Sequence, residues 1–388
     1  MSGFNGSAAR RGMGLCVVLG LLGACATGRQ GATASQATTP QQVEHSTQEC
    51  TGDNADKCAD LGADYAEGRG VPQDAHRAVA LFDKACEGGS ARGCFNLGLS
   101  YMNGRGVPQD AHRTAALFDK ACEGGEPQGC TNLGVLYLKG NGVPQDARRA
   151  ATLYEKGCEG GDTTGCHNLG VRYLEGRGVP QDERRAAALF DKACQGGHAQ
   201  GCYNLGMRYL EGTGVPQDER RAAALYEKAC EGGELQGCYN LGVSYAKGVG
   251  VAQDARRAAT LFEKACEGGK TEGCYNLGVS YAKGLGVPKD ASRAATLYEK
   301  ACEGGDAQGC YNLGMRYLEG TGVPQDARRA AALFDKACEG GDAQGCYNLG
   351  ISYVKGSGVP QDKRRATTLF EKACKGGEAA SCSVLNQL

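Results

Sequence analysis

A pair of cysteines recurs every 36 residues along most of this 388-residue chain. Within each pair the second cysteine follows the first by eight positions, and no residue is inserted or deleted between one pair and the next. A fixed period of about 20 to 50 residues is typical of solenoids, in which each repeat buries its apolar face only against a neighbouring repeat. The pattern therefore predicts an array of stacked repeats instead of a single large core.

The cysteines form two columns, and nine full units run from Cys58 to Ser381. The first column contains Cys50, Cys86, Cys122, Cys158, Cys194, Cys230, Cys266, Cys302, Cys338 and Cys374. The second contains Cys58, Cys94, Cys130, Cys166, Cys202, Cys238, Cys274, Cys310, Cys346 and Cys382. Residues 382–388 begin a tenth unit.

Composition narrows the class of protein further. Glycine accounts for 63 residues, aromatic residues for only 6%, and tryptophan is absent, so an ordinary enzyme domain is a poor fit. The 43 basic and 44 acidic residues balance, which leaves no basic surface for a nucleic-acid partner. The 22 cysteines are too many for a reducing cytosol unless they bind metals.

One unit, residues 129–161, shows the expected local structure. Apolar or small residues between Cys130 and Tyr137 recur at i, i+3, i+4 and i+7, which predicts one face of a helix. Gly140 is a suitable C-cap for this first helix, and Asp146 is a suitable N-cap for a second helix. Each unit is therefore predicted to be a helix, a turn, a second helix and a second turn.

The motifs of the fifth unit resemble those of the Sel1-like repeat family, which is related to tetratricopeptide repeats. They are Asn-Leu-Gly-x-x-Tyr at 204–209, Gly-x-Gly-Val-Pro-x-Asp at 212–218 and Ala-x-x-Leu-Tyr-x-Lys-Ala-Cys at 222–230. The added cysteines resemble those of a secreted branch typified by the Helicobacter cysteine-rich proteins. The resemblance implies an all-α, right-handed α/α solenoid of nine 36-residue repeats over residues 50–388, with one disulfide per repeat.

The cysteine pairs are expected to form ten disulfides, from Cys50–Cys58 to Cys374–Cys382. Each pair spans the end of one unit's second helix and the start of the next unit's first helix, where the chain turns back on itself. Metal binding is the alternative, but this spacing is not that of a zinc site and the five histidines are scattered. We therefore expect neither a metal nor another cofactor.

The first 49 residues have a different character. Residues 1–24 contain two arginines followed by a short apolar run, and Leu22-Gly23-Ala24-Cys25 resembles a bacterial lipobox. This predicts a lipoprotein signal peptide over 1–24, lipidation of Cys25 and a disordered tether over 25–49; a plain secretory signal is the alternative. Ala26 favours sorting to the outer membrane, with the protein facing the periplasm or the surface and touching the membrane only through its lipid.

Three columns of the first helix are candidates for binding a protein or peptide along a concave groove. The asparagine column supplies Asn168, Asn204, Asn240 and Asn312; the tyrosine column supplies Tyr203, Tyr239, Tyr275 and Tyr311; and a variable column supplies Arg172, Arg208 and Arg316. The variable column changes in charge and size, so packing does not dictate it, and we expect it to face the groove with the tyrosine column. The apolar column one position earlier is expected in the core. The alternatives are that each asparagine holds a local loop or neighbouring backbone, and that the tyrosines pack between units.

A catalytic alternative rests on Ser-x-x-Lys, the nucleophile motif of serine β-lactamases and penicillin-binding proteins, at Ser244, Ser280 and Ser352. Some cysteine-rich relatives are described as penicillin-binding proteins or weak β-lactamases, so the resemblance also implies this alternative. No residue set here supplies a nucleophile, a base and an oxyanion hole together. The sequence therefore favours a monomeric, non-catalytic envelope scaffold with no assigned catalytic residue.

Overall fold

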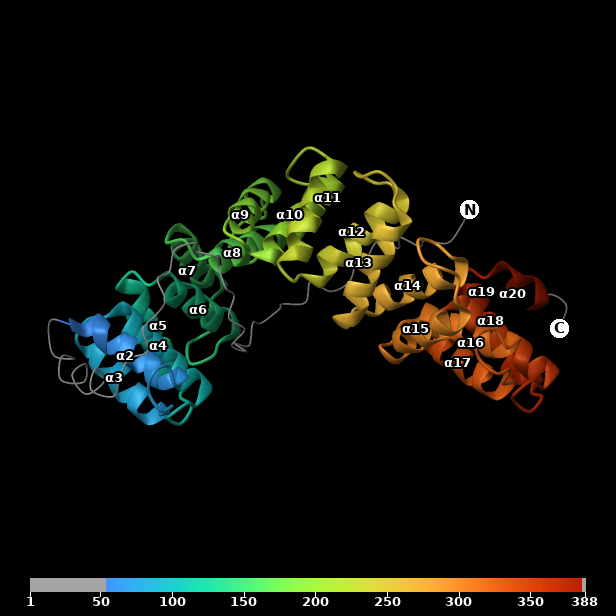
Figure 1. Ribbon diagram of the computed structural model, residues 1–388, viewed down its shortest axis with the longest axis horizontal. Coiled ribbons are helices and arrows are strands. Elements are labelled where there is room, and N and C mark those ends of the chain that lie inside the picture. The colour runs from blue at the N-terminus through green and yellow to red at the C-terminus, as the bar shows by residue number, and fades with distance from the viewer. Residues whose placement is uncertain (1–53, 386–388) are drawn as a thin grey trace. The chain divides into compact units, whose positions relative to one another are not determined.

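The computed structural model describes residues 54–385, and every regular element within them is a helix (Figure 1). The first helices of successive repeats are α2 (Ala55–Glu67), α4 (Ala91–Asn103), α6 (Pro127–Lys139), α8 (Thr163–Glu175), α10 (Ala199–Glu211), α12 (Leu235–Lys247), α14 (Thr271–Lys283), α16 (Ala307–Glu319), α18 (Ala343–Lys355) and α20 (Ala379–Leu385). The second helices are α3 (Ala75–Glu87), α5 (Ala111–Glu123), α7 (Ala147–Glu159), α9 (Glu183–Gln195), α11 (Glu219–Glu231), α13 (Ala255–Glu267), α15 (Ala291–Glu303), α17 (Ala327–Glu339) and α19 (Lys363–Lys375). Between residues 54 and 385, no helix is both long and apolar enough to cross a membrane.

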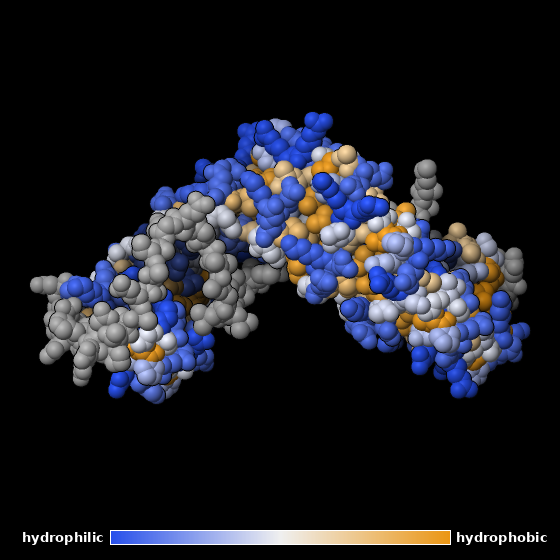
Figure 2. All heavy atoms as spheres, viewed as in Figure 1, coloured by the Kyte–Doolittle hydropathy of each residue, from blue (hydrophilic) through white to orange (hydrophobic). Residues whose placement is uncertain are grey.

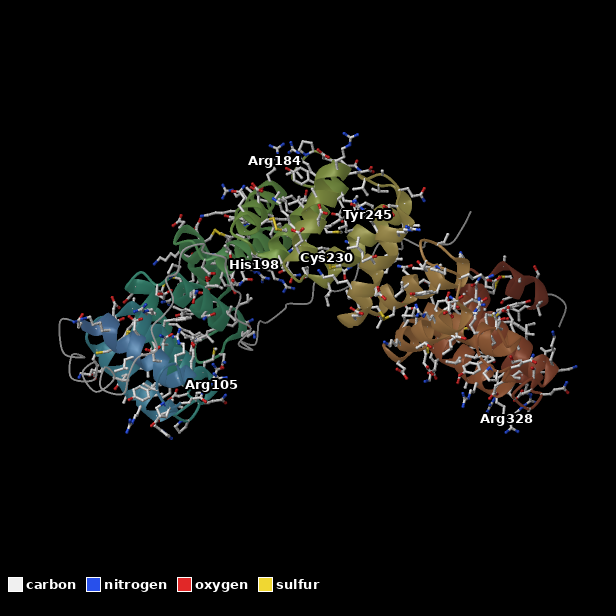
Figure 3. The ribbon with its side chains drawn as sticks, in the orientation of Figure 1. Arg105, Arg184, His198, Cys230, Tyr245 and Arg328 are labelled. Carbon is white, nitrogen blue, oxygen red and sulfur yellow. A yellow bond between two sulfur atoms is a disulfide. The ribbon has the colours of Figure 1, made fainter. Side chains whose placement is uncertain are left out.

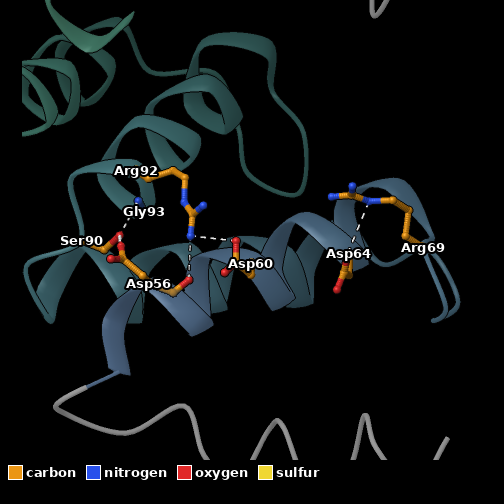
Figure 4. A network of polar contacts seen from close by, with 7 residues as sticks. All are labelled: Asp56, Asp60, Asp64, Arg69, Ser90, Arg92 and Gly93. Atoms are coloured by element: carbon orange, nitrogen blue, oxygen red, sulfur yellow. Dashed lines mark hydrogen bonds and ion pairs between the residues drawn. The ribbon is translucent and has the colours of Figure 1, made fainter. Parts of the chain in front are cut away.

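The described chain forms two compact units. The first contains residues 54–136 and 140–144, and the second contains residues 137–139 and 145–385. In the first unit, polar contacts join neighbouring repeats: Arg92 of α4 donates to Asp60 of α2, with 2.7 Å between Nη2 and Oδ1 (Figure 4). In the second unit, each helix from α8 to α19 packs against the helix before it and the helix after it, as stacked repeats require.

The helix ends follow from the predicted capping residues. The side chain of Asp146 accepts hydrogen bonds from the backbone N–H groups of Arg148 and Arg149 at the start of α7. Gly140 ends α6 with φ 71°, in the left-handed region that favours glycine. Both predicted caps are confirmed, and the same pair of devices recurs in the other repeats.

A glycine lets the two helices of a repeat approach closely. A Cβ atom added to Gly242 of α12 would lie 2.7 Å from the Phe262 ring of α13. Phe262 is fully buried, and the flat ring covers the bare backbone of α12. The close packing of the two helices therefore explains the glycine of the Asn-Leu-Gly motif.

Among the disulfides with both cysteines in residues 54–385, nine staple consecutive repeats, and their Cα atoms lie 4.4 to 4.9 Å apart. They are Cys86–Cys94, Cys122–Cys130, Cys158–Cys166, Cys194–Cys202, Cys230–Cys238, Cys266–Cys274, Cys302–Cys310, Cys338–Cys346 and Cys374–Cys382. Cys25 and Cys50 lie outside the described residues, as do the predicted signal peptide and tether. The predicted all-α repeat architecture with one disulfide per repeat is confirmed.

An arginine–tyrosine contact, missed in the sequence, ties the two helices of each repeat. The guanidinium of Arg257 in α13 lies 5.4 Å from the centre of the Tyr245 ring in α12 and donates to the Tyr245 hydroxyl at 2.9 Å. Figure 3 labels Tyr245. The equivalent pairs are Arg77–Tyr65, Arg113–Tyr101, Arg149–Tyr137, Arg185–Tyr173, Arg221–Tyr209, Arg293–Tyr281, Arg329–Tyr317 and Arg365–Tyr353. Because these arginines are largely exposed to solvent, each contact adds only a little to stability.

Candidate functional site

A column of tyrosines follows the second cysteine of the later repeats and forms what we call the tyrosine ladder. It consists of Tyr203, Tyr239, Tyr275, Tyr311 and Tyr347, all half-buried. Each ring packs against the aromatic residue of the second helix in its own repeat; the Tyr275 and Tyr298 ring centres, for example, are 6.0 Å apart. The ladder rings are therefore held in place by the core while part of each remains accessible.

The asparagine column joins this ladder to the next repeat. Asn276 Nδ2 donates to the hydroxyl of Tyr239 at 3.3 Å, and Asn276 itself is only 6% exposed. Burial raises the pKa of Tyr239, and the hydrogen bond from Asn276 opposes that rise. In the same register, Asn240, Asn312 and Asn348 oppose the rise that burial causes in the pKa values of Tyr203, Tyr275 and Tyr311. Asn276 thus ties its repeat to the preceding one.

The amides of the four asparagines predicted to contact a partner are engaged within the protein. Asn168 Oδ1 lies 3.4 Å from His167 Nδ1, and Asn204 Nδ2 lies 2.9 Å from His167 Nε2. Asn240 Nδ2 lies 3.6 Å from the Met207 sulfur. Asn312 Nδ2 donates to the Gln308 carbonyl at 2.9 Å.

The variable column faces inward, contrary to the sequence expectation. The side chain of Arg172 is 2% exposed and pairs with Glu175, with 2.9 Å between Nη2 and Oε2. Arg208 and Arg316 are 12% and 22% exposed and pair with Glu211 and Glu319. An arginine can be buried here because the glutamate one turn later neutralises it. Arg172 is therefore not available to a partner at the surface.

The apolar column, expected in the core, instead reaches the surface beside the ladder. Met207, Val243, Met315 and Ile351 are half-buried, and only Val279 is buried, at 5% exposure. Figure 2 shows hydrophobic residues at the surface over the region that Figure 1 labels α12 to α16. Ladder and apolar column lie four residues apart on each first helix, so they share a face.

Carboxylates line the ladder at the start of the later first helices. Asp306 and Asp342 cap α16 and α18, and each accepts a hydrogen bond from a backbone N–H at 2.6 Å. Burial raises the pKa of both carboxyls, and the neighbouring carboxylates Glu272 and Glu378 raise them further. Within the part of the chain that the structure describes, neither Asp306 nor Asp342 pairs with a basic side chain. This face therefore holds negative charge beside exposed aromatic and apolar atoms.

The Ser-x-x-Lys motifs do not form a nucleophile and base. The hydroxyl of Ser280 donates to the Asn276 carbonyl at 3.0 Å and is buried, whereas Lys283 is exposed. Ser352 donates in the same way to the carbonyl one turn earlier. In the described range, residues 54–385, no three side chains of the metal-binding types come together at a metal site.

We expect no hydrolysis of a chromogenic β-lactam by the oxidised protein, and no change on Ser280→Ala substitution. The serine hydroxyl is a helix-internal donor, so its removal deletes only one local hydrogen bond. Initial rates followed by absorbance, with a β-lactamase as positive control, test this. Hydrolysis that Ser280→Ala abolishes in a protein with unchanged helical content would contradict it.

Comparison with known proteins agrees with the repeat geometry. A family model described as Sel1 repeat matches residues 58–90, 91–126, 127–162, 163–198, 199–234, 235–270, 271–306, 307–342 and 343–378. No curated protein matches the chain. The family prediction made from the sequence motifs is thus confirmed.

Solved structures give the same result. The chain is similar to a protective antigen of uropathogenic Escherichia coli strains that displays an SLR fold, with 30% identity, a TM-score of 0.73 and coverage of 89% of this chain and 82% of that one. It is also similar to a Sel1 repeat protein from Oxalobacter formigenes, with 26% identity, a TM-score of 0.55 and coverage of 63% and 96%. Helicobacter pylori cysteine rich protein B is 34% identical over 34% of this chain and 96% of that one, with a TM-score of 0.30. Sel1 repeat proteins generally mediate protein–protein interactions, and this chain belongs to the Sel1 repeat family.

Proposed function

We propose that this protein is a non-catalytic scaffold that binds an extended segment of a partner protein along the tyrosine ladder. The observation that supports this most directly is the half-exposed aromatic and apolar face on α12, α14, α16 and α18. Exposed apolar atoms gathered on one face of a protein indicate an interaction site more often than isolated exposed residues do. The repeated spacing suits a partner that lies along several repeats.

The ladder rings are well prepared for binding. Tyr311 is held against Phe334, with 6.0 Å between the ring centres, so its ring loses little freedom when a partner covers it. Tyrosine also offers a hydroxyl beside its apolar ring, which suits an interface that is partly wet. Met315, four residues later on α16, adds a flexible apolar surface.

The charge of the face indicates the chemistry of the partner. Asp306 and Asp342 lie close enough to Tyr275 that both carboxylates raise the pKa of its hydroxyl, although burial contributes most. Burial raises their own pKa values, and among the described residues neither carboxyl has a basic partner to offset this. A lysine or arginine side chain would supply it. The proposed partner segment is therefore both basic and apolar.

Synthetic peptides test this proposal. We expect the full chain to bind a twelve-residue peptide of alternating lysine and valine at least tenfold more tightly than one of alternating glutamate and valine, by fluorescence anisotropy at moderate salt. The double variant Asp306→Asn/Asp342→Asn should weaken the lysine peptide severalfold, because asparagine keeps the helix caps and removes both charges. Tyr275→Ala/Tyr311→Ala should also weaken it.

A matched control variant distinguishes a loss of charge at the ladder from a loss of net charge elsewhere on the protein. Glu303→Gln/Glu339→Gln removes two charges at exposed positions near the ends of α15 and α17. This variant should bind the lysine peptide nearly as the wild type does. Equal weakening by both double variants would show that the peptide responds to overall charge, and the ladder assignment would then be rejected.

We also propose that the protein resides outside the cytoplasm as a lipoprotein anchored through Cys25. The nine disulfides support an oxidising compartment, because such bonds rarely persist in the cytosol. Metabolic labelling with a radioactive fatty acid should label the wild type and not Cys25→Ala. Labelling that persists in the variant would reject this anchor.

A further inference from the structure

Two histidines interrupt the regular repeat pattern in the second of the two compact units. His167 of α8 occupies the column that holds tyrosine in the later repeats, and His198 occupies the N-cap position of α10 (Figure 3). Their 31-residue separation matches that of Tyr275 and Asp306 in a later repeat. The two imidazole rings stack with 4.7 Å between their centres and 22° between their planes.

Both rings are held in ways that require an unprotonated nitrogen. His198 Nδ1 accepts the backbone N–H of Gly201 at 3.1 Å, and that amide can only donate. His167 Nε2 lies 2.9 Å from Asn204 Nδ2, the donor end of the amide, so Nε2 is the acceptor. A proton on His198 Nδ1 would break the cap of α10, and one on His167 Nε2 would face the Asn204 donor.

The surroundings oppose protonation of His167. Burial, together with charge repulsion from His198 and from the buried Arg172 of the same helix, lowers its pKa to about 4, against an opposing hydrogen bond with Asn168. From α9 the Phe190 ring packs on His167, with 5.7 Å between the ring centres, and offers no charge. On α7, Tyr154 interacts with Arg172 and stays neutral, because burial raises its pKa to about 12.

The surroundings of His198 also oppose its protonation. Burial lowers its pKa, and Asp162 at the N-cap of α8 partly opposes this. The positive end of the α10 dipole also disfavours an imidazolium at this position. The neutral form of the pair is therefore the one that fits the fold.

We propose that the stacked His167–His198 pair is an acid-sensitive latch between the fourth and fifth repeats. Acid protonates the pair, the α10 cap opens, and the contact of Asn204 with α8 is lost. The consequence for binding rests on the proposed function of the ladder, because Tyr203 lies on the helix that loosens.

The direction of the effect follows from linkage. A histidine whose pKa in the folded protein is below its unfolded value of about 6.5 favours folding fully above that pH. The contribution of His167 is lost as the pH falls from about 6.5 towards 4. Asp306 behaves oppositely, because burial raises its pKa and protonation then favours the folded form.

The molecule contains its own reference for a test. Helices α10 and α16 have the same thirteen-residue sequence, but His198 caps α10 and Asp306 caps α16. The amides of Gly201 and Gly309 therefore have the same neighbours in sequence, so their intrinsic exchange rates are closely matched at any pH. Their hydrogen-exchange rates can be read from peptides that include residue 198 or residue 306.

Hydrogen exchange on the full, oxidised chain at pH 7 and pH 5 tests the latch. We expect exchange in α10 to rise on the order of tenfold relative to α16 at the lower pH. The variant His167→Tyr/His198→Asp, which restores the pattern of the later repeats, should remove this difference. The single variants His167→Tyr and His198→Asp should each reduce it.

An unchanged ratio between α10 and α16 from pH 7 to pH 5 would overturn the proposal. The same holds for a ratio that rises equally in the double variant. Binding of the lysine–valine peptide at both pH values is measured separately. If the exchange ratio changes but no peptide binds at either pH, the latch stands and the proposed function of the ladder fails.

Discussion

Gly250→Ala is expected to lower the free energy of unfolding by about 2–4 kcal/mol. Gly250 has φ 72°, which costs alanine about 1 kcal/mol. The new Cβ atom would also lie 2.0 Å from the carbonyl oxygen of Glu219, in the backbone at the start of α11. A backbone group cannot rotate away as a side chain can, so the turn after α12 must separate from the preceding repeat. Urea unfolding followed by circular dichroism measures the loss.

Gly269→Ala is the matched control for this prediction. Gly269 has φ 91°, so alanine is strained there too, but nothing lies within 4 Å of the added Cβ atom. This variant should lose only about 1 kcal/mol. Equal losses in the two variants would show that backbone conformation alone explains the turn glycines, and that the contact between repeats contributes nothing.

The second large effect concerns the disulfides. Cys230→Ala/Cys238→Ala should destabilise the protein by about 4 kcal/mol, of which about 2.5 kcal/mol comes from the loop-closure term. The remainder reflects burial: Cys230 and Cys238 are 4% and 0% exposed and pack on the fully buried Ala265 of α13. Removing both sulfur atoms leaves a cavity that the short side chain of Ala265 cannot fill.

The last disulfide provides the comparison. Cys374 and Cys382 close a loop of the same length, but both are half-buried instead of buried. Cys374→Ala/Cys382→Ala should therefore cost about 2.5 kcal/mol, close to the loop-closure term alone. Urea midpoints of the two double variants, each with the other eight described bonds verified by mass, make the comparison. Equal losses would exclude a contribution from packing.

Much of the fold could be predicted because local signals repeat. The period set the repeat length, Asp146 and Gly140 marked helix ends by capping chemistry, and cysteines eight residues apart at a tight turn indicated the disulfides. Each of these signals depends on residues close together in sequence. Because these local signals agree in every repeat, the helices could be predicted without any knowledge of distant contacts.

The candidate site was harder to predict, because it depends on how far each first helix is rotated. A change of one position turns a helix face by about 100°, so neighbouring columns differ greatly in burial. Arg172 was predicted to face the groove because its column varies in charge and size, yet Glu175 one turn later allows it to be buried. That i, i+3 pairing was the available signal. The contact of Asn276 with Tyr239 joins residues 37 positions apart, and no local pattern announces it.

The short span of each disulfide has a consequence for how such a chain acquires its bonds. Repeats this similar, with α10 and α16 identical, invite pairing between the wrong partners during oxidation. A thiol eight residues away is encountered far more often than one in another repeat, since the entropy lost on closing a loop grows with its length. We therefore expect each bond to form correctly as soon as its own hairpin folds, with little help from a disulfide isomerase.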